Sequence, residues 1–126
     1  MQKNQLICGE DDDASMLRML TRSMSAAGFQ VAPFGSAEGL LISGQMSKAA
    51  CIILDMDLPG LSGLELQQRL KLTGRDVPII FISGQATEKK RHRALMDGAI
   101  AFFDKPFDIN ALLTAVRSAV VTMTFA

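Results

Sequence analysis

The chain has 126 residues, of which 48% are hydrophobic, with 13 basic and 13 acidic residues and a mean hydropathy of +0.23. This length and composition predict one globular domain over residues 1–126 and exclude a disordered chain. The balanced charge gives no reason to expect nucleic-acid or membrane binding by this domain, and the sequence shows no signal peptide or transmembrane span. A cytoplasmic location is therefore expected, with Cys8 and Cys51 as free thiols in apolar strands.

Short apolar segments alternate with segments of helical spacing along the whole chain. The expected strands are residues 5–9, 29–34, 51–54, 77–82 and 100–103. The expected helices are residues 14–27, 36–44, 62–72, 87–97 and a last helix capped by Asp108. Five such pairs predict an α/β fold, a parallel sheet with helices on both faces. The doubly wound, flavodoxin-like strand order 2-1-3-4-5 fits, because Pro33 weakens the second strand and places it at an edge.

Polar residues follow four of the expected strands at the point where each strand ends. They are Asp11, Asp12 and Asp13 after the first strand, Asp55 and Asp57 after the third, Ser83 and Gly84 after the fourth, and Asp104, Lys105 and Pro106 after the fifth. Sites in sheets of this kind lie outside the carboxyl ends of the strands. We therefore expect carboxylates, a hydroxyl and an ammonium group to converge at one edge of the sheet.

Carboxylates held within a few ångströms repel one another and stay ionised together only if a cation joins them. Oxygen ligands favour a hard ion such as Mg²⁺, and the only histidine, His92, lies in the polar fourth helix, away from the strand ends. A metal, Lys105, the Ser83 hydroxyl and a backbone N–H, for which Gly84 is the candidate, would together receive a phosphoryl group. Asp55 at the centre can act as the nucleophile and become an aspartyl phosphate.

Four motifs, EDDD, ILDMDLPGLSG, FISG and FFDKPF, occur in this order along the chain. Together they resemble the receiver domain of bacterial two-component response regulators over essentially the whole sequence. The resemblance implies a phosphoryl acceptor, not a turnover enzyme, that receives its group on Asp55 from a sensor histidine kinase or phosphotransfer protein. It implies Mg²⁺ held by Asp11, Asp12, Asp55 and the backbone carbonyl of Asp57, a switch made of Ser83 and Phe102, an invariant lysine at Lys105, and a cis bond before Pro106.

The resemblance also bears on partners. The segment DGAIAFFDKPF is most similar to receivers of helix-turn-helix transcription factors, which implies a DNA-binding output domain if the chain is cut from a longer protein. The surface of the fourth helix, fifth strand and fifth helix would be the switch surface and a candidate homodimer interface. The basic run at residues 89–93 is interpreted first as a solvated helix face and second as a partner-docking surface.

Some points stay open at the level of sequence. Four consecutive acids at residues 10–13 allow the acidic pair to shift by one position; the distance to the break at Gly28 favours Asp11 and Asp12, with Asp13 as a helix cap. Glu10 stands where the family usually has an apolar residue, and Arg91 and His92 stand where small or apolar residues are common in the family. Two alternatives are a degenerate receiver that acts as a constitutive interaction module and a haloacid-dehalogenase-type phosphatase, whose nucleophile belongs on the first strand.

Overall fold

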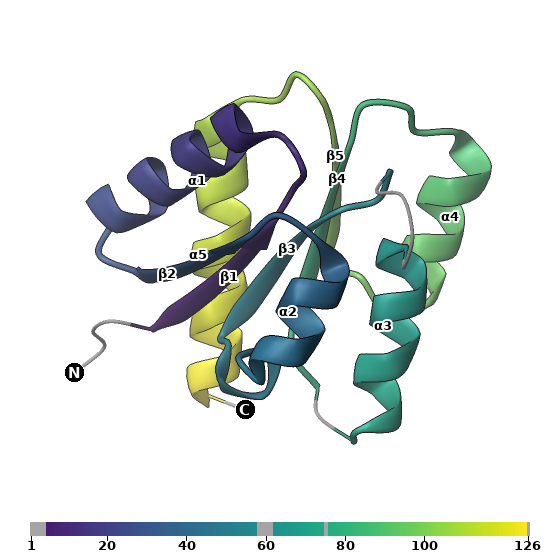
Figure 1. Ribbon diagram of the computed structural model, residues 1–126, viewed down its shortest axis with the longest axis horizontal. Helices are drawn as coiled ribbons and strands as arrows, with labels where there is room; N and C mark the ends of the chain where they lie inside the picture. The colour runs from purple at the N-terminus through teal and green to yellow at the C-terminus, as the bar shows by residue number, and fades with distance from the viewer. Residues whose placement is uncertain (1–4, 58–61, 75, 126) are drawn as a thin grey trace.

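Five parallel strands form the centre of the molecule in the order β2-β1-β3-β4-β5 (Figure 1). The structure is a computed structural model that describes residues 5–57, 62–74 and 76–125. The strands are β1 (Leu6–Glu10), β2 (Gln30–Phe34), β3 (Cys51–Asp55), β4 (Ile79–Ser83) and β5 (Ala101–Asp104). Every neighbouring pair is parallel, which confirms the predicted fold class and strand order.

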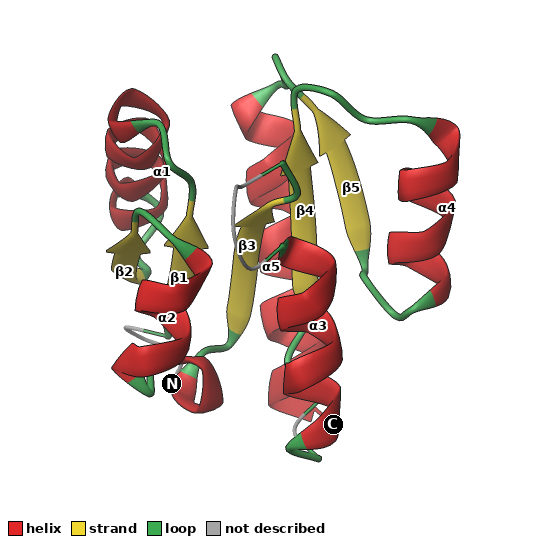
Figure 2. Cartoon of the chain, turned by 45° about the vertical axis from the view of Figure 1, so that its right-hand side comes forward, coloured by secondary structure: helices red, strands yellow, loops and turns green. Residues whose placement is uncertain are grey.

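The helices cover both faces of this sheet. They are α1 (Ala14–Ala26), α2 (Ala37–Ser43), α3 (Gly63–Leu72), α4 (Glu88–Met96) and α5 (Ile109–Phe125), with a short 3₁₀ helix η1 (Met46–Lys48) that the apolar pattern did not predict. Helices α1 and α5 lie on one face, and α2, α3 and α4 lie on the other (Figures 1 and 2). Within the described ranges, no helix has the length and apolar character needed to cross a membrane.

Side-chain caps fix where the helices begin. Asp13 accepts a hydrogen bond from the Ser15 N–H at 2.8 Å, which starts α1 as predicted. Ser62 and Glu65 form a reciprocal capping box at the start of α3. The predicted chain break at Pro59-Gly60 lies outside the described residues.

Strand β4 begins at Ile79, two residues later than its apolar pattern predicts. Pro78 has no backbone N–H and cannot donate to a sheet ladder. Its carbonyl still accepts a hydrogen bond from the Ile52 N–H at 2.9 Å. The chain at Pro78 therefore runs alongside β3 before regular pairing starts.

Alternating strand residues build two separate apolar layers. Cys8, Leu54 and Phe81 face α2, α3 and α4, whereas Cys51 and Ile53 face α1 and α5. The two cysteines are free and buried on opposite faces, as expected. Burial raises the pKa of Cys8 to about 11 and that of Cys51 to about 12, so both thiols stay protonated. Both faces of the sheet are therefore covered, and because its strands are parallel, their carboxyl ends lie at one edge.

Candidate functional site

Three carboxylates meet at the carboxyl ends of β1 and β3. Asp11 follows β1 directly, and Asp55 is the last residue of β3. Oxygen atoms of Asp11, Asp12 and Asp55 all lie within 4.8 Å of one another. Asp11 and Asp55 are buried, whereas Asp12 is exposed. The geometry thus favours the Asp11/Asp12 register, since the Asp13 carboxylate is used to cap α1.

Backbone turns orient two of these carboxylates. The Asp13 N–H donates to Asp11 Oδ1 at 2.9 Å, and the Asp57 N–H donates to Asp55 Oδ1 at 2.8 Å. In both turns an aspartate accepts from the backbone two residues ahead, which is a local preference of this residue type. In each carboxylate one oxygen is therefore fixed by the backbone, and the other lies toward Lys105, the residue after β5.

Lys105 brings the positive charge to this edge. Its Nζ atom lies 2.8 Å from Asp11 Oδ2 and 3.1 Å from Asp55 Oδ2. The peptide bond between Lys105 and Pro106 is cis, as expected, and the Lys105 N–H donates to the Ser83 carbonyl at 2.7 Å. Burial lowers the pKa of Lys105, but the hydrogen bonds and charges of the two aspartates outweigh it, and the net shift is upward. The ammonium group therefore stays charged.

The electrostatics of Asp55 reflect a balance between burial and neighbours. Burial raises its pKa and the charge of Asp11 raises it further, whereas the Asp57 N–H and Lys105 lower it; the net shift is upward. The single positive charge of Lys105 thus does not offset the combined effect of burial and neighbouring negative charge on Asp55. A set of closely spaced carboxylate oxygens with excess negative charge fits a hard divalent cation such as Mg²⁺.

Ser83 and Gly84 lie beside the acidic edge, but their donors face Asp57. The Ser83 hydroxyl donates to Asp57 Oδ2 at 2.6 Å, and the N–H groups of Gly84 and Gln85 donate to the same oxygen at 2.9 Å and 3.2 Å. The acidic cluster of Asp11, Asp12 and Asp55 therefore does not include the Asp57 side chain. The sequence predicted the Asp57 backbone carbonyl as a metal ligand and left the role of the side chain open. The sequence feature that could have indicated a separate role for this side chain is its place as the second acid of the Asp-x-Asp motif, two residues after Asp55.

Phe102 lies under Arg91 in the layer between the sheet and α4. The ring is buried, and its centroid lies 6.3 Å from that of Phe81. The Arg91 guanidinium carbon lies 4.8 Å from the centroid of Phe102, and Arg91 Nη2 pairs with Asp104 Oδ2 at 2.6 Å. The unusual arginine in α4 thus binds β5, which sequence reasoning did not predict.

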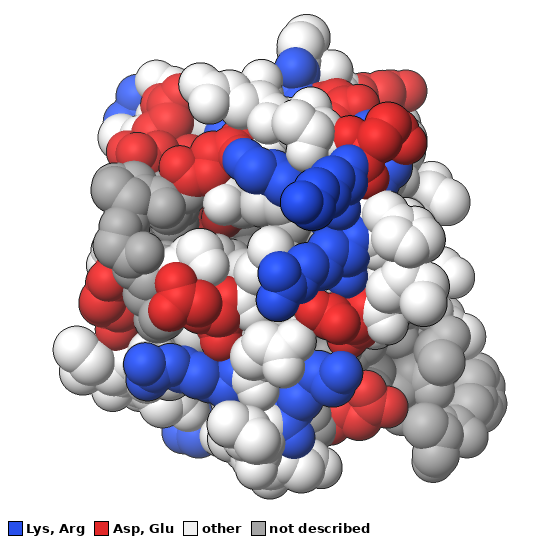
Figure 3. All heavy atoms as spheres, turned by 90° about the vertical axis from the view of Figure 1, so that its right-hand side faces the viewer, with Lys and Arg blue, Asp and Glu red and all other residues white. Residues whose placement is uncertain are grey.

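The rest of the basic run on α4 matches the prediction of a solvated face. Lys89, Lys90, His92 and Arg93 are exposed. The view onto this side of the molecule shows lysine and arginine side chains gathered between acidic groups (Figure 3). The face is therefore mixed in charge and not a continuous basic patch.

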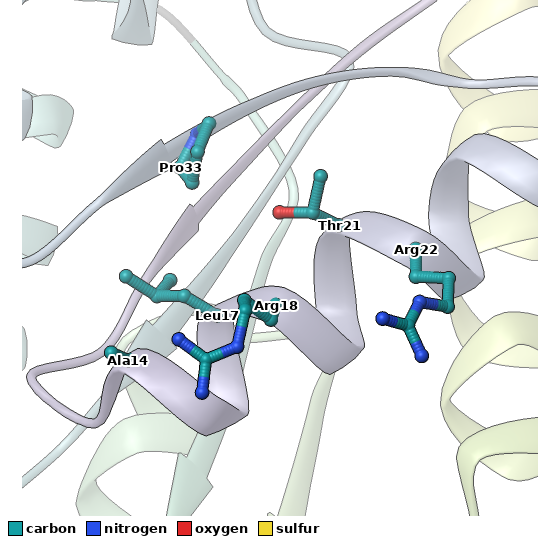
Figure 4. Close-up of a pocket in the computed structure, with 6 residues that line it drawn as sticks. All are labelled: Ala14, Leu17, Arg18, Thr21, Arg22 and Pro33. Atoms are coloured by element: carbon teal, nitrogen blue, oxygen red, sulfur yellow. The ribbon is translucent and has the colours of Figure 1, made fainter.

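A separate hollow of about 530 Å³ lies between α1 and β2 (Figure 4). Its lining residues are Ala14, Leu17, Arg18, Thr21, Arg22 and Pro33. It contains no carboxylate and none of the predicted site residues. The candidate functional site is therefore the edge formed by the strand ends and not this hollow.

Known proteins are similar to this chain in sequence and in fold. The chain matches the family model described as "Response regulator receiver domain" over residues 7–117. Over 109 residues it is 42% identical to nodulation protein W of Bradyrhizobium diazoefficiens and 40% identical to the response regulator protein TodT of Pseudomonas putida. Each match covers 86% of this chain and 48% of the relative, so the chain spans about half the length of these curated relatives. A receiver domain structure from Clostridium thermocellum is similar with a TM-score of 0.87 at 24% identity, covering 96% of this chain and 98% of that one.

Proposed function

Because the chain belongs to the response regulator receiver family of two-component signalling, we propose that it accepts a phosphoryl group on Asp55 and acts as a switch. The observation that carries this proposal is the convergence of Asp11, Asp12, Asp55 and Lys105 at one edge of the sheet. Family members of this kind are usually switches, not turnover enzymes. The donor would be a phosphohistidine on a sensor histidine kinase or phosphotransfer protein.

The chemistry follows from how Asp55 is held. Its Oδ1 atom accepts from the Asp57 N–H and its Oδ2 atom lies 3.1 Å from Lys105 Nζ, so both oxygens are oriented before a donor arrives. During transfer an Asp55 oxygen forms a P–O bond, the P–N bond of the donor breaks, and its electron pair goes to the imidazole nitrogen. Lys105 then offsets charge on the phosphoryl oxygens. Mg²⁺, held by Asp11, Asp12, Asp55 and the Asp57 carbonyl, would neutralise further phosphoryl charge when bound.

The phosphorylated side chain would change the surface through Ser83 and Phe102. The added charge and acceptor oxygens would draw the Ser83 hydroxyl and the Gly84 N–H toward Asp55. Because Phe102 packs against Phe81 of β4 and Arg91 of α4, a shift in β4 would be passed to the face formed by α4, β5 and α5. That face is the proposed homodimer or output surface, and a DNA-binding output domain would account for the greater length of the relatives.

Intact-mass measurement after incubation with Mg²⁺ and phosphoramidate, whose P–N bond resembles that of phosphohistidine, tests the proposal. The unmodified sequence and the exposed control variant Asp76→Asn should each gain one phosphoryl group, and Asp55→Asn should gain none. EDTA and the variant Asp12→Asn should both suppress the reaction, because EDTA removes the metal and the substitution removes the charge of one of its proposed ligands. Association state measured on the same samples reports whether modification changes the surface. Equal phosphate uptake by Asp55→Asn would refute the acceptor.

The two alternatives give different outcomes in this experiment. A degenerate receiver would show no Mg²⁺-dependent labelling, although the complete set of Asp11, Asp12, Ser83 and Lys105 argues against it. A haloacid-dehalogenase-type phosphatase would have its nucleophile at the end of β1, so the variant Asp55→Asn would still react with phosphoramidate. The family match also disfavours the phosphatase.

A further inference from the structure

The Asp57 side chain accepts hydrogen bonds from three donors of the loop that joins β4 to α4. The Ser83 hydroxyl, the Gly84 N–H and the Gln85 N–H all meet Asp57 Oδ2, at 2.6, 2.9 and 3.2 Å. Hydrogen bonds to an ionised carboxylate are stronger than those between neutral groups. Donors converging on one anionic oxygen form an arrangement suited to any oxyanion.

Two of these donors, from Ser83 and Gly84, are the ones that the proposed phosphoryl group on Asp55 would need, so this inference rests on the proposed function. The Ser83 hydroxyl carries one hydrogen, as does each backbone N–H. A hydrogen directed at the Asp57 carboxylate is not available in full to a phosphoryl oxygen. The Asp57 N–H meanwhile donates to Asp55 Oδ1 at 2.8 Å, so the two aspartates are held beside each other.

Charge adds to this competition. A phosphoryl group brings a charge of about −2 to Asp55, whose Oδ1 atom accepts from the Asp57 N–H, and the carboxylate of Asp57 carries charge of the same sign, so the two groups repel. The carboxylate is held mainly through Oδ2. Among the described residues, Oδ1 is buried without a hydrogen-bond partner, and the Nζ atom of Lys90 lies 3.9 Å from it. Release of Oδ2 from the loop would therefore free the whole side chain.

We propose that Asp57 is an internal competitor of the phosphoryl group. Its carboxylate occupies the oxyanion donors of the β4–α4 loop and is displaced when Asp55 is modified. It therefore weakens the binding of a phosphoryl group, or of an anion of the same shape, at Asp55. A carboxylate that merely stabilised the loop would have the opposite effect, because its removal would disorder the donors and weaken anion binding.

Titration with beryllofluoride, which forms a phosphoryl-like adduct on carboxylates, separates these roles. The binding is followed in saturating Mg²⁺ by the ¹H–¹⁵N NMR signals of Gly84 and Gln85. The variant Asp57→Ala should reach half-saturation at a beryllofluoride concentration about tenfold lower than the unmodified sequence, which corresponds to the loss of one charge-assisted competitor. Asp57→Asn keeps the shape but loses the charge, and should show a smaller fall. The control Asp76→Asn removes one exposed negative charge elsewhere and should leave the midpoint unchanged.

Each outcome decides the matter. A midpoint that is unchanged or higher in both Asp57 variants, while the unmodified sequence binds the probe, overturns this inference and leaves the proposed function intact. Failure of every protein to bind, with Asp55→Asn indistinguishable from the unmodified sequence, overturns both. If Asp57→Ala does not fold, as judged by its amide spectrum, the isosteric Asp57→Asn gives the decision.

Discussion

The guanidinium carbon of Arg91 lies 4.8 Å from the centre of the Phe102 ring, directly over the predicted switch aromatic. The same arginine pairs with Asp104 at 2.6 Å, and its Nη1 atom lies 3.5 Å from the Phe102 carbonyl. One side chain of α4 therefore contacts the ring, the backbone and the end of β5. The position of Phe102 is thus tied to α4 by contacts that a solvated helix face would not make.

Replacing Arg91 by lysine should destabilise the fold. Lysine keeps the charge but cannot stack a planar group on the ring while it pairs with Asp104. Because the Arg91 side chain is 28% exposed, the expected loss in the free energy of unfolding is only about 1 kcal/mol. Urea denaturation measures it, with Arg93→Lys as control, since Arg93 is 67% exposed and its partner Asp97 is 3.9 Å away. Equal effects of the two substitutions would contradict a special role for Arg91.

Removing the ammonium group of Lys105 should make stability depend on Mg²⁺. In Lys105→Met the carboxylates of Asp11 and Asp55 lose their cation, and the free energy of unfolding in EDTA should fall by about 3 kcal/mol. Added Mg²⁺ should restore part of this loss, because the metal neutralises the same oxygens. Denaturation with EDTA and with Mg²⁺ gives both values. The exposed Lys89→Met should show neither effect, and an equally stable Lys105→Met in EDTA would contradict the prediction.

The fold and the convergence of the strand ends could be predicted because both depend on local patterns. A continuous apolar run such as residues 51–54 identifies a strand covered on both faces, and the residue after it must lie at the edge where Asp55 lies. The structure was needed to favour one acidic register over the other, because four adjacent acids differ in the sequence only by position. Because the Asp13 side chain caps α1, it is not a member of the acidic pair that the structure favours.

The contacts that sequence reasoning missed join residues distant in the chain. Asp57 and Ser83 are 26 residues apart, and Arg91 and Asp104 are 13 apart. The sequence pattern assigns each residue to a strand, helix or loop. The direction of its side chain depends in addition on the donors and acceptors that the sheet register brings near it. The identity of the partner of Asp57 therefore required the three-dimensional arrangement of β3 and β4.

Gly63 is a position where a single methyl group should disturb the site. A Cβ atom there would lie 2.7 Å from Phe81 Cε1 and 3.2 Å from the Asp55 carbonyl oxygen. Because Phe81 is fully buried, a shift of its ring would displace packed neighbours, and Gly63→Ala should cost about 1–3 kcal/mol in unfolding free energy. It should also slow phosphoryl uptake by displacing Asp55.

The matched control for Gly63 is Gly35→Ala, because nothing lies within 4 Å of a Cβ atom at Gly35. Thermal unfolding and the phosphoramidate assay on both variants test the effect. Combining Gly63→Ala with Phe81→Leu should cost less than the sum of the two single changes, since a smaller side chain makes room. Simple additivity would show that the ring is not the obstacle.

Glu10 gives the protein an unusual dependence of stability on pH. The side chain is fully buried on β1, and neither carboxylate oxygen has a hydrogen-bond partner among the residues that the structure describes. Burial is the main cause that raises the pKa of Glu10 from 4.5 to about 8, and the charges of Asp55, Asp11 and Asp12 raise it further. The backbone N–H of Asp55 lowers this pKa in part, although it does not meet the geometry of a hydrogen bond. The folded protein therefore binds a proton at Glu10 that the unfolded chain releases.

Between pH 4.5 and about 8 the folded state binds more protons than the unfolded state at this residue, so the free energy of unfolding should fall as pH rises and level off above about pH 8. Glu10→Gln removes the titration and should be more stable than the unmodified sequence at pH 8.5 by on the order of 3 kcal/mol, with little difference at pH 4.5. Urea denaturation in EDTA at a series of pH values measures both curves without competition from bound metal. Glu88→Gln makes the same chemical change on a side chain that is 94% exposed and should leave the curve unchanged. A Glu10→Gln curve parallel to that of the unmodified sequence would mean that Glu10 is ionised in the fold, and a cation or donor not yet identified would then have to compensate its charge.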